Sequence, residues 1–409
     1  MGKAIGSKAV VAGSLCAGAG ILISPDTLVR LGQFTGYTGL WGMGILALAM
    51  VLFVYLIPGM ERQSGPPASV WTYLPLTVRA VAAVVLPTGV LVSSGFVFNE
   101  IFLYWFPNFG FAFLLLFLIL AVNIMPVETG LKFQMGVVGV GLGSLLILVI
   151  AGLAGAGESH AASKYTLLPL PLVPLPVLFF PLLLWVGADI SGIVRAGIRR
   201  ADTEEGRSLV GLTIVCGGLI FLAWAVVSAF HVPLDKLADT SIPHLKAARG
   251  ILGDTGRYLM GSAVIFGALA AVNALFLACR LYASSLARGG YLPGFAGSSR
   301  GIVILLAVAI GLMMASGMAG SEKLEYWIEA VFVLWMMSYT GIFTGNDSHS
   351  HTPPFIRHLA SVGGVLLLFH GEGWLLKWGY VIVILGIAFL QQIIFSPGSI
   401  RTSRSIYRT

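Results

Sequence analysis

The stretch Gly18-Ala19-Gly20-Ile21, followed by Ser24-Pro25, interrupts the first apolar segment of the chain. The stretch Gly187-Ala188-Asp189, followed by Ser191-Gly192, interrupts the sixth. Non-helical backbone at membrane depth is tolerated only where protein or a cavity surrounds it. Interrupted helices at corresponding places in two halves of a chain indicate a transporter binding site. The alternative for each break is that glycine only lets helices pack closely.

The composition is that of a membrane protein. Of 409 residues, 57% are apolar and 10% charged, whereas soluble domains have about 45–50% apolar and about 25% charged residues. A soluble fold of this length could not bury so much apolar surface, but a bilayer can. The formal charge of +7 could suggest a nucleic-acid binder, yet the basic residues lie in short loops, where they act as topology signals. We therefore expect membrane lipid as a partner, and no nucleic acid.

About 12 apolar segments approach the roughly 20 residues that a spanning helix needs. We predict an all-α polytopic membrane protein with its first and sixth spans broken. Residues 1–154 and 176–345 are expected to form two five-helix repeats, 355–396 two additional helices and 397–409 a basic cytoplasmic tail. Two longer polar loops are expected, at 155–175 and 231–255. The predicted spans are 9–31, 38–58, 76–104, 109–126, 131–154, 176–198, 207–230, 256–287, 301–319, 325–345, 355–371 and 374–396.

Lys and Arg residues orient the chain, because cytoplasmic loops carry an excess of them. With the N-terminus inside, sixteen of the 24 Lys and Arg residues fall on the cytoplasmic side. We therefore expect both termini in the cytoplasm and a multi-pass protein of the bacterial inner membrane. The N-terminus Met1-Gly2-Lys3 runs directly into the first segment, so no removable signal peptide is expected.

The first break offers backbone groups to a substrate. Gly18, Ala19, Gly20 and Ile21 provide backbone N–H groups with little side-chain bulk. The half-helix that starts near Ile21 to Pro25 carries a positive partial charge at its N-terminus. A substrate carboxylate placed there would meet aligned donors.

The second break carries an acid, Asp189, inside an apolar run. A carboxylate at membrane depth costs free energy unless it is paired or solvated, and is a functional hypothesis by default. Asp189 is expected to bind a substrate ammonium or to take up and release a proton; a structural cap of the following half-helix is the alternative. Gly187, Ala188 and Trp185 complete this predicted site, with Trp185 either a gate or a packing residue.

Glu100, near the outer end of the third apolar segment, and Asp26, which follows Pro25 and could cap the outer half of the first, are further candidates for proton coupling. No cofactor or metal site is predicted. The cysteines Cys16, Cys216 and Cys279 lie in apolar segments without ligand spacing. The cluster of Asp347, His349, His351 and His358 is interpreted as a solvated loop, since nothing completes a tetrahedral ligand set.

Several motifs resemble those of the amino acid–polyamine–organocation superfamily. Gly18 to Leu22 with Pro25 resembles its first-helix signature, and Gly65 to Tyr73 looks like the segment before its third span. Asn123 to Lys132 is similar to its link between spans four and five. Trp185 to Asp189 stands where the family has an aromatic, a glycine and usually a glutamate. Arg280 to Pro293 resembles the motif that ends its eighth span, and this match is the most specific.

The resemblance implies the leucine-transporter-type fold, with two inverted five-helix repeats and two extra helices. It also implies amino acids or related small organic amines as substrates, which would meet the residues of both breaks. We expect a secondary transporter working by alternating access, coupled to protons or exchanging. A transporter-like membrane receptor that senses its ligand, and a channel, are the competing classes; an enzyme is not expected. The sequence does not identify the particular substrate, and it leaves open whether the protein forms a homodimer.

Overall fold

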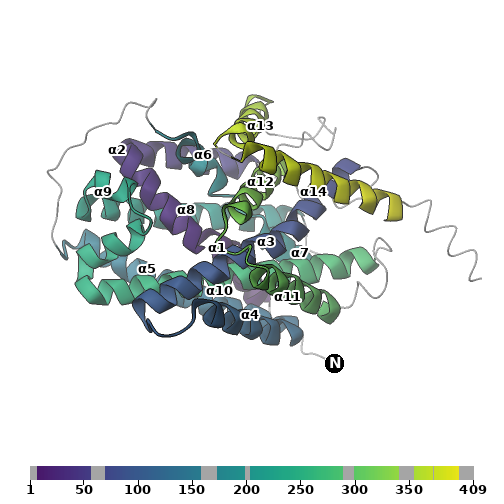
Figure 1. Ribbon diagram of the computed structural model, residues 1–409, viewed down its shortest axis with the longest axis horizontal. Helices are drawn as coiled ribbons and strands as arrows, with labels where there is room; N and C mark the ends of the chain where they lie inside the picture. The colour runs from purple at the N-terminus through teal and green to yellow at the C-terminus, as the bar shows by residue number, and fades with distance from the viewer. Residues whose placement is uncertain are drawn as a thin grey trace, which may run out of the picture.

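The structure is a computed structural model that describes residues 7–56, 70–157, 173–198, 203–288, 299–339, 354–371 and 373–395. These residues form helices and no strands. Figure 1 shows α13 and α14 along one edge and α9 at the opposite side. In chain order the helices are α1 (Ser7–Leu22), α2 (Pro25–Leu56), α3 (Val70–Ile101), α4 (Asn108–Ile124), α5 (Val127–Leu153), α6 (Leu175–Leu183), α7 (Ile190–Ile198), α8 (Thr203–His231), α9 (Leu234–Ala238), α10 (Pro243–Arg288), α11 (Ser299–Ala315), α12 (Glu322–Tyr339), α13 (Pro354–Phe369) and α14 (Trp374–Phe395).

Some predicted features fall outside the described residues. These are the tail 397–409, most of the loop 155–175, the loop that carries His349 and His351, residues 65–69, and the end of the 280–293 motif.

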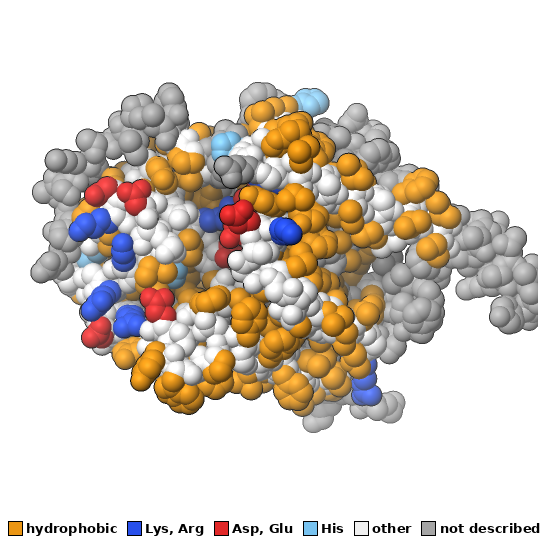
Figure 2. Space-filling view, viewed as in Figure 1, with side chains coloured by type: hydrophobic (Ala, Val, Ile, Leu, Met, Phe, Trp, Pro, Cys, Tyr) orange, Lys and Arg blue, Asp and Glu red, His pale blue; other side chains and the backbone are white. Residues whose placement is uncertain are grey.

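Six of the described helices are long and apolar enough to cross a membrane: α2, α3, α5, α8, α10 and α14. The helices α1, α4 and α11 are apolar but shorter. Large apolar side chains are exposed on the outer helices, for example Phe117 on α4, Ile150 on α5 and Leu312 on α11. Figure 2 shows hydrophobic side chains over the side where α4, α11 and α14 lie. A bilayer would cover this surface, since a soluble monomer rarely exposes so large an apolar patch.

The predicted spans 9–31 and 176–198 each cover two helices, and each of the other spans coincides with one helix or with part of one, but the junctions differ from expectation. The first two spans share a helix, because α2 runs from Pro25 to Leu56 through a bend at Gly39, whose φ is 57°. The predicted polar loop 231–255 is largely helical. It contains α9 and the first part of α10, which bends again at Gly253 with φ 59°. How many of these segments cross the bilayer stays a prediction.

The segment 231–255 is helical because it is amphipathic, a pattern that counting polar residues does not reveal. Leu237 and Ala247 are buried, whereas Asp235, Lys246 and Arg249 are exposed. Charged side chains accordingly gather over α9 and the start of α10 in Figure 2. The buried face of α9 packs on α2.

Helix α10 runs through the middle of the helix assembly and packs against α1, α3, α5, α7 and α11. It is the most buried of the six long helices. Its contact with α1 is close at Gly267, where an added Cβ would overlap the carbonyl oxygen of Ile23. Glycine is therefore required at this crossing.

We expect Gly267→Ala to lower the apparent Tm of the purified protein, because overpacking a close contact costs about 1–3 kcal/mol. The matched control is Gly139→Ala on α5, where an added Cβ would have nothing within 4 Å. In that variant alanine favours the helix by roughly 0.5–1 kcal/mol. Thermal melts of both variants in one detergent make the comparison. Equal melting temperatures for the two variants would contradict the close crossing of α1 and α10.

Candidate functional site

The first break lies a few residues later than the sequence predicted. Gly18, Ala19 and Gly20 are inside α1, which continues to Leu22. Glycine alone does not end a helix whose surroundings lack competing water. Ser24 ends it because it precedes Pro25, and a residue before proline avoids the α conformation. Pro25 then starts α2, where its missing N–H costs nothing.

The second break lies as expected, at residues 184–189 between α6 and α7. Gly187 has φ 95°, a conformation that favours glycine. A Cβ on Gly187 would also lie 2.5 Å from the side chain of Ile21, and one on Gly18 would lie 3.0 Å from the carbonyl oxygen of Ala188. The second break therefore packs directly against the last turns of α1.

A cavity of about 70 Å³ lies beside the two breaks. Its walls come from α1, α2, α3, α6, α10 and α12 and are mostly apolar, including Val90, Phe180 and Phe332. One end is polar and is lined by Ser24, Asp26, Thr27, Arg30 and Glu329. The cavity thus combines an apolar body with an end that carries charges of both signs.

The charges at the polar end are linked to the C-terminal helix. The guanidinium of Arg30 lies 3.9 Å from one carboxylate oxygen of Glu329, and the ammonium of Lys377 lies 2.6 Å from the other. The Lys377 side chain is only 5% exposed, and its ammonium also donates to the carbonyl of His370 at 2.9 Å. Exposed ion pairs contribute little, so the buried Lys377 is the stronger partner of Glu329.

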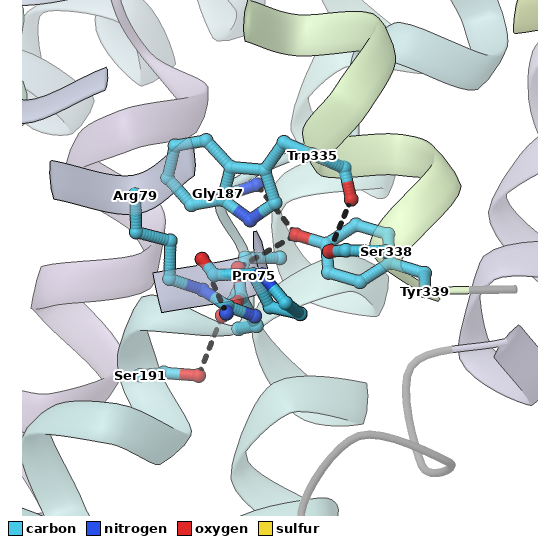
Figure 3. Close-up of polar contacts among 9 residues, drawn as sticks. Pro75, Arg79, Gly187, Ser191, Trp335, Ser338 and Tyr339 are labelled. Atoms are coloured by element: carbon cyan, nitrogen blue, oxygen red, sulfur yellow. Dashed lines mark hydrogen bonds and ion pairs between the residues drawn. The ribbon is translucent and has the colours of Figure 1, made fainter. Parts of the chain in front are cut away.

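Asp189 lies in a cluster of polar side chains from three elements. Figure 3 shows two of its members, Arg79 and Tyr339, close to Gly187. Asp189 Oδ2 accepts hydrogen bonds from Nε and Nη2 of Arg79 on α3, at 3.0 and 2.8 Å. Its Oδ1 accepts the hydroxyl proton of Tyr339 on α12 at 2.6 Å. The Tyr339 oxygen in turn accepts the backbone N–H of Gly187 at 3.0 Å. Both oxygens of Asp189 therefore have protein partners in this conformation.

Arg79 is itself held by groups of α3 and α12 in addition to Asp189. Arg79 also donates to the carbonyl of Pro75 at 3.1 Å, and its guanidinium carbon lies 5.9 Å from the centre of the Trp335 ring. The Asp189 side chain joins α3 to α12, whereas the capping alternative would need bonds to N–H groups of α7. Its roles toward a substrate ammonium or a proton stay predictions.

A second cavity, of about 210 Å³, lies beside Arg79 of this cluster. It is lined by α3, α7, α10, α11 and α14, and its polar lining residues include Arg79, Tyr282 and Gln391. Leu275 on α10 lines both cavities. The two cavities are therefore separated by side chains at the second break and at α10.

The other predicted site residues lie at different distances from the first cavity. Ile21 and Asp26 line it. Trp185 is fully buried and its ring points toward α8, since a Cβ on Gly218 would lie 3.0 Å from it. Glu100 is exposed, and its backbone carbonyl accepts a hydrogen bond from Arg257.

The structure gives Gly20 a packing role in place of the substrate contact that the sequence predicted. A Cβ there would lie 2.5 Å from Nε2 of Gln134 on α5 and 2.9 Å from the carbonyl oxygen of Ala270 on α10. Gly20 thus allows α1 to approach its neighbours closely. Substitution at Gly20 would disturb this contact before it affected a substrate.

Sequence reasoning missed Arg79, Tyr339 and Lys377. Arg79 was counted among the topology residues, although it lies inside the predicted span 76–104 and its side chain is 13% exposed. An arginine within an apolar span needs a buried partner, and this signal could have found it. Tyr339 gives no such signal, because aromatic residues are common in apolar helices.

No group of three or more His, Cys, Asp or Glu residues in the described part of the chain could hold a metal ion. The search of curated proteins found no match. The family model of the amino acid permeases matches residues 7–300. This match covers most of the chain, including both breaks and most walls of the first cavity. The chain therefore belongs to the amino acid permease family, a family of membrane transporters within the amino acid–polyamine–organocation superfamily.

Proposed function

We propose that this permease is a secondary transporter that moves amino acids or related small organic amines by alternating access. The observation that carries the proposal is the first cavity, which lies where the two broken helices meet. Discontinuous helices at such a place provide backbone groups for a substrate and can move relative to the rest of the bundle. Family membership supports transport as the activity.

The lining of the first cavity supports the substrate class. A zwitterion needs groups of both charges, which Asp26, Arg30 and Glu329 provide at the polar end. The hydroxyls of Ser24 and Thr27 add uncharged hydrogen-bonding groups there. The apolar walls suit the carbon skeleton of an amino acid or an amine. Pockets of this kind, apolar with a few placed polar groups, are typical of small-molecule sites.

The proposed architecture is the leucine-transporter-type fold with about 12 spans. In it, α1 to α5 form the first repeat, α6 to α12 the inverted second repeat, and α13 and α14 the two additional helices. In this arrangement the breaks after Leu22 and Leu183 would occupy corresponding places in the two repeats. We propose that the protein lies in a bacterial inner membrane, with both termini on the cytoplasmic side.

Alternating access requires a barrier that can form on either side of the substrate. The cluster of Arg79, Asp189 and Tyr339 joins α3, α12 and the second break, and its Arg79 lines the second cavity. We propose that it closes the path on the side of the second cavity. Movement of α7 relative to α3 and α12 would open this path, because the cluster links these elements through side chains.

Coupling to sodium is not expected. The stretch of α10 that crosses α1, Gly267 to Val272, has no hydroxyl side chain. Sodium is a hard cation that prefers oxygen ligands, and backbone carbonyls alone would supply too few. We therefore propose proton coupling or exchange.

Filling the first cavity should stop transport. We expect Val90→Trp to lower uptake of the substrate into proteoliposomes at least tenfold, because the larger side chain would occupy the space for the substrate. Val90 is 5% exposed and lines the cavity. The control is Val140→Trp on α5, which makes the same exchange at a position that is 45% exposed. Amino acids and amines, screened first by thermal shift, are the test substrates.

Equal uptake by the two tryptophan variants would place the substrate elsewhere. Saturable binding without uptake by the parent protein would favour the receptor alternative.

The ion pair at the second break should be detectable as an energetic coupling. Removing one partner of a buried pair costs about 3–5 kcal/mol, because the other charge stays buried. We expect Asp189→Asn to lower the apparent Tm and to reduce transport roughly tenfold or more. Asparagine still accepts the Tyr339 hydroxyl, so the change isolates the charge. Initial rates of Asp189→Asn that equal those of the parent over a range of pH would exclude a role for the charge in transport.

The matching partner variant is Arg79→Met, and the double variant with Asp189→Asn removes both charges. We expect the double variant to recover most of the lost stability, since a buried pair can be replaced by uncharged groups at little cost. Melting temperatures of the four proteins give the coupling. Additive losses would show that the two residues do not act as a pair.

A further inference from the structure

A chain of buried amide side chains, which we term the amide joint, links α4, α10 and α5 to the broken helix α1. Asn123 Nδ2 donates to Asn273 Oδ1 at 2.7 Å, and Asn273 Nδ2 donates to Gln134 Oε1 at 2.7 Å. Gln134 Nε2 then donates to the carbonyl oxygens of Cys16 at 2.9 Å and of Ala270 at 3.1 Å. The three amide side chains are fully buried.

The direction of this chain follows from its end. The two carbonyl oxygens can only accept, so Gln134 must present its NH₂ group to them. Its Oε1 is then an acceptor for Asn273, which also donates to the carbonyl of Gly130 at 3.2 Å. Asn273 Oδ1 is in turn the acceptor for Asn123. Each link determines the orientation of the next, and no link carries a charge.

The position of the amide joint matters because it lies next to the first break. The carbonyl of Cys16 belongs to α1 and that of Ala270 to α10, the two helices that cross at Gly267. Gly20 leaves the space into which Gln134 reaches, since a Cβ there would lie 2.5 Å from its Nε2. Backbone carbonyl oxygens that converge from two helices are also ligands that a hard cation prefers. Here the amide of Gln134 occupies the space between them.

We propose that Gln134 is a positioning residue that fastens α1 to α10 in place of a coupling ion. Its amide does not gain or lose a proton, so the amide joint neither binds nor releases sodium or protons during the transport cycle. A movement of α1 away from α5 and α10 would break the hydrogen bond from Gln134 to the carbonyl of Cys16, whereas the bond from Gln134 to Ala270 would remain. This proposal rests on the transport function proposed above. It favours exchange of substrates over uptake driven by an ion bound at the amide joint.

The described elements around the amide joint carry ionisable side chains, among them Lys8 on α1, Glu128 on α5, and Cys279 and Tyr282 on α10. Cys16 lies on α1 and the exposed Lys132 on α5. Arg280 on α10 donates to the carbonyls of Asn123 and Met125, at 2.6 and 2.8 Å. These groups are present in the parent and in every variant below, so a comparison with the parent at the same pH removes their contribution.

The test introduces a group that can titrate. In Gln134→Glu, the protonated carboxyl keeps one O–H donor for the two carbonyls, whereas the ionised form sets a negative charge against them. The folded state therefore needs the proton, so its stability is present at acid pH and is lost as the pH rises. A buried glutamate can change its charge several pH units above its ordinary range. We expect substrate exchange by Gln134→Glu, relative to the parent, to fall at least tenfold between about pH 5 and about pH 8.

The matched control is Gln134→Met, which has a similar length and no donor. We expect its exchange to be low at every pH, with no pH dependence relative to the parent. Exchange by the parent should be unchanged when choline replaces sodium. The apparent Tm of purified Gln134→Glu should also fall relative to the parent as the pH rises, and this measurement does not depend on transport.

A Gln134→Glu variant whose exchange and melting temperature both follow those of the parent at each pH would overturn the proposal, as would a strict sodium requirement of the parent. A parent protein that neither takes up nor exchanges any substrate would instead contradict the proposed transport function. In that case the melting temperatures alone would decide whether Gln134 holds α1 to α10.

Discussion

Backbone that leaves the helical conformation at membrane depth must find hydrogen-bond partners inside the protein, because lipid offers none. At the second break this requirement is met by Tyr339, whose oxygen accepts the N–H of Gly187. The Tyr339 hydroxyl is held by Asp189, and the charge of Asp189 is held by Arg79. One continuous series of hydrogen bonds and ion pairs thus holds α3, α12 and the second break together. A buried charge has to be paired, and the pair comes from a helix distant in sequence.

The two breaks are held by different chemistry. The second break depends on a charged pair, with donor and acceptor from α3 and from the turn itself. Beside the first break, α1 is held by the neutral amide joint that ends at the carbonyls of Cys16 and Ala270. Neutral hydrogen bonds contribute about 0.5–1.5 kcal/mol each, whereas bonds to charged groups contribute about 1.5–3 kcal/mol. The link of α1 to α10 is therefore the weaker of the two and can separate at a smaller cost.

Lys and Arg residues in this chain either lie in loops or pair with buried groups, and a count of basic residues per loop does not distinguish these two roles. Arg79, Arg195, Arg280 and Lys377 entered the topology count, yet the structure buries them to a large extent. Lys377 binds Glu329 at the polar end of the first cavity, so α14 reaches the candidate site although it is not part of either break. A Lys or Arg residue near the end of an apolar segment can be a loop residue or the partner of a buried acid, and the sequence pattern is the same for both.

Sequence by itself determined the helical membrane class and the approximate places of most helices and of the two breaks, because apolar length, glycine and proline act locally. It also identified Asp189 as unusual, since an acid in an apolar run is costly wherever it lies. Tertiary structure alone decided which residues contact Asp189, which neighbours require a glycine at position 20, and which groups Gln134 hydrogen-bonds. Arg79 and Tyr339 lie 110 and 150 residues from Asp189, and Gln134 lies 118 residues from Cys16. Such contacts depend on how helices cross, and crossing is set by the packing of whole faces, which no local pattern of residues specifies.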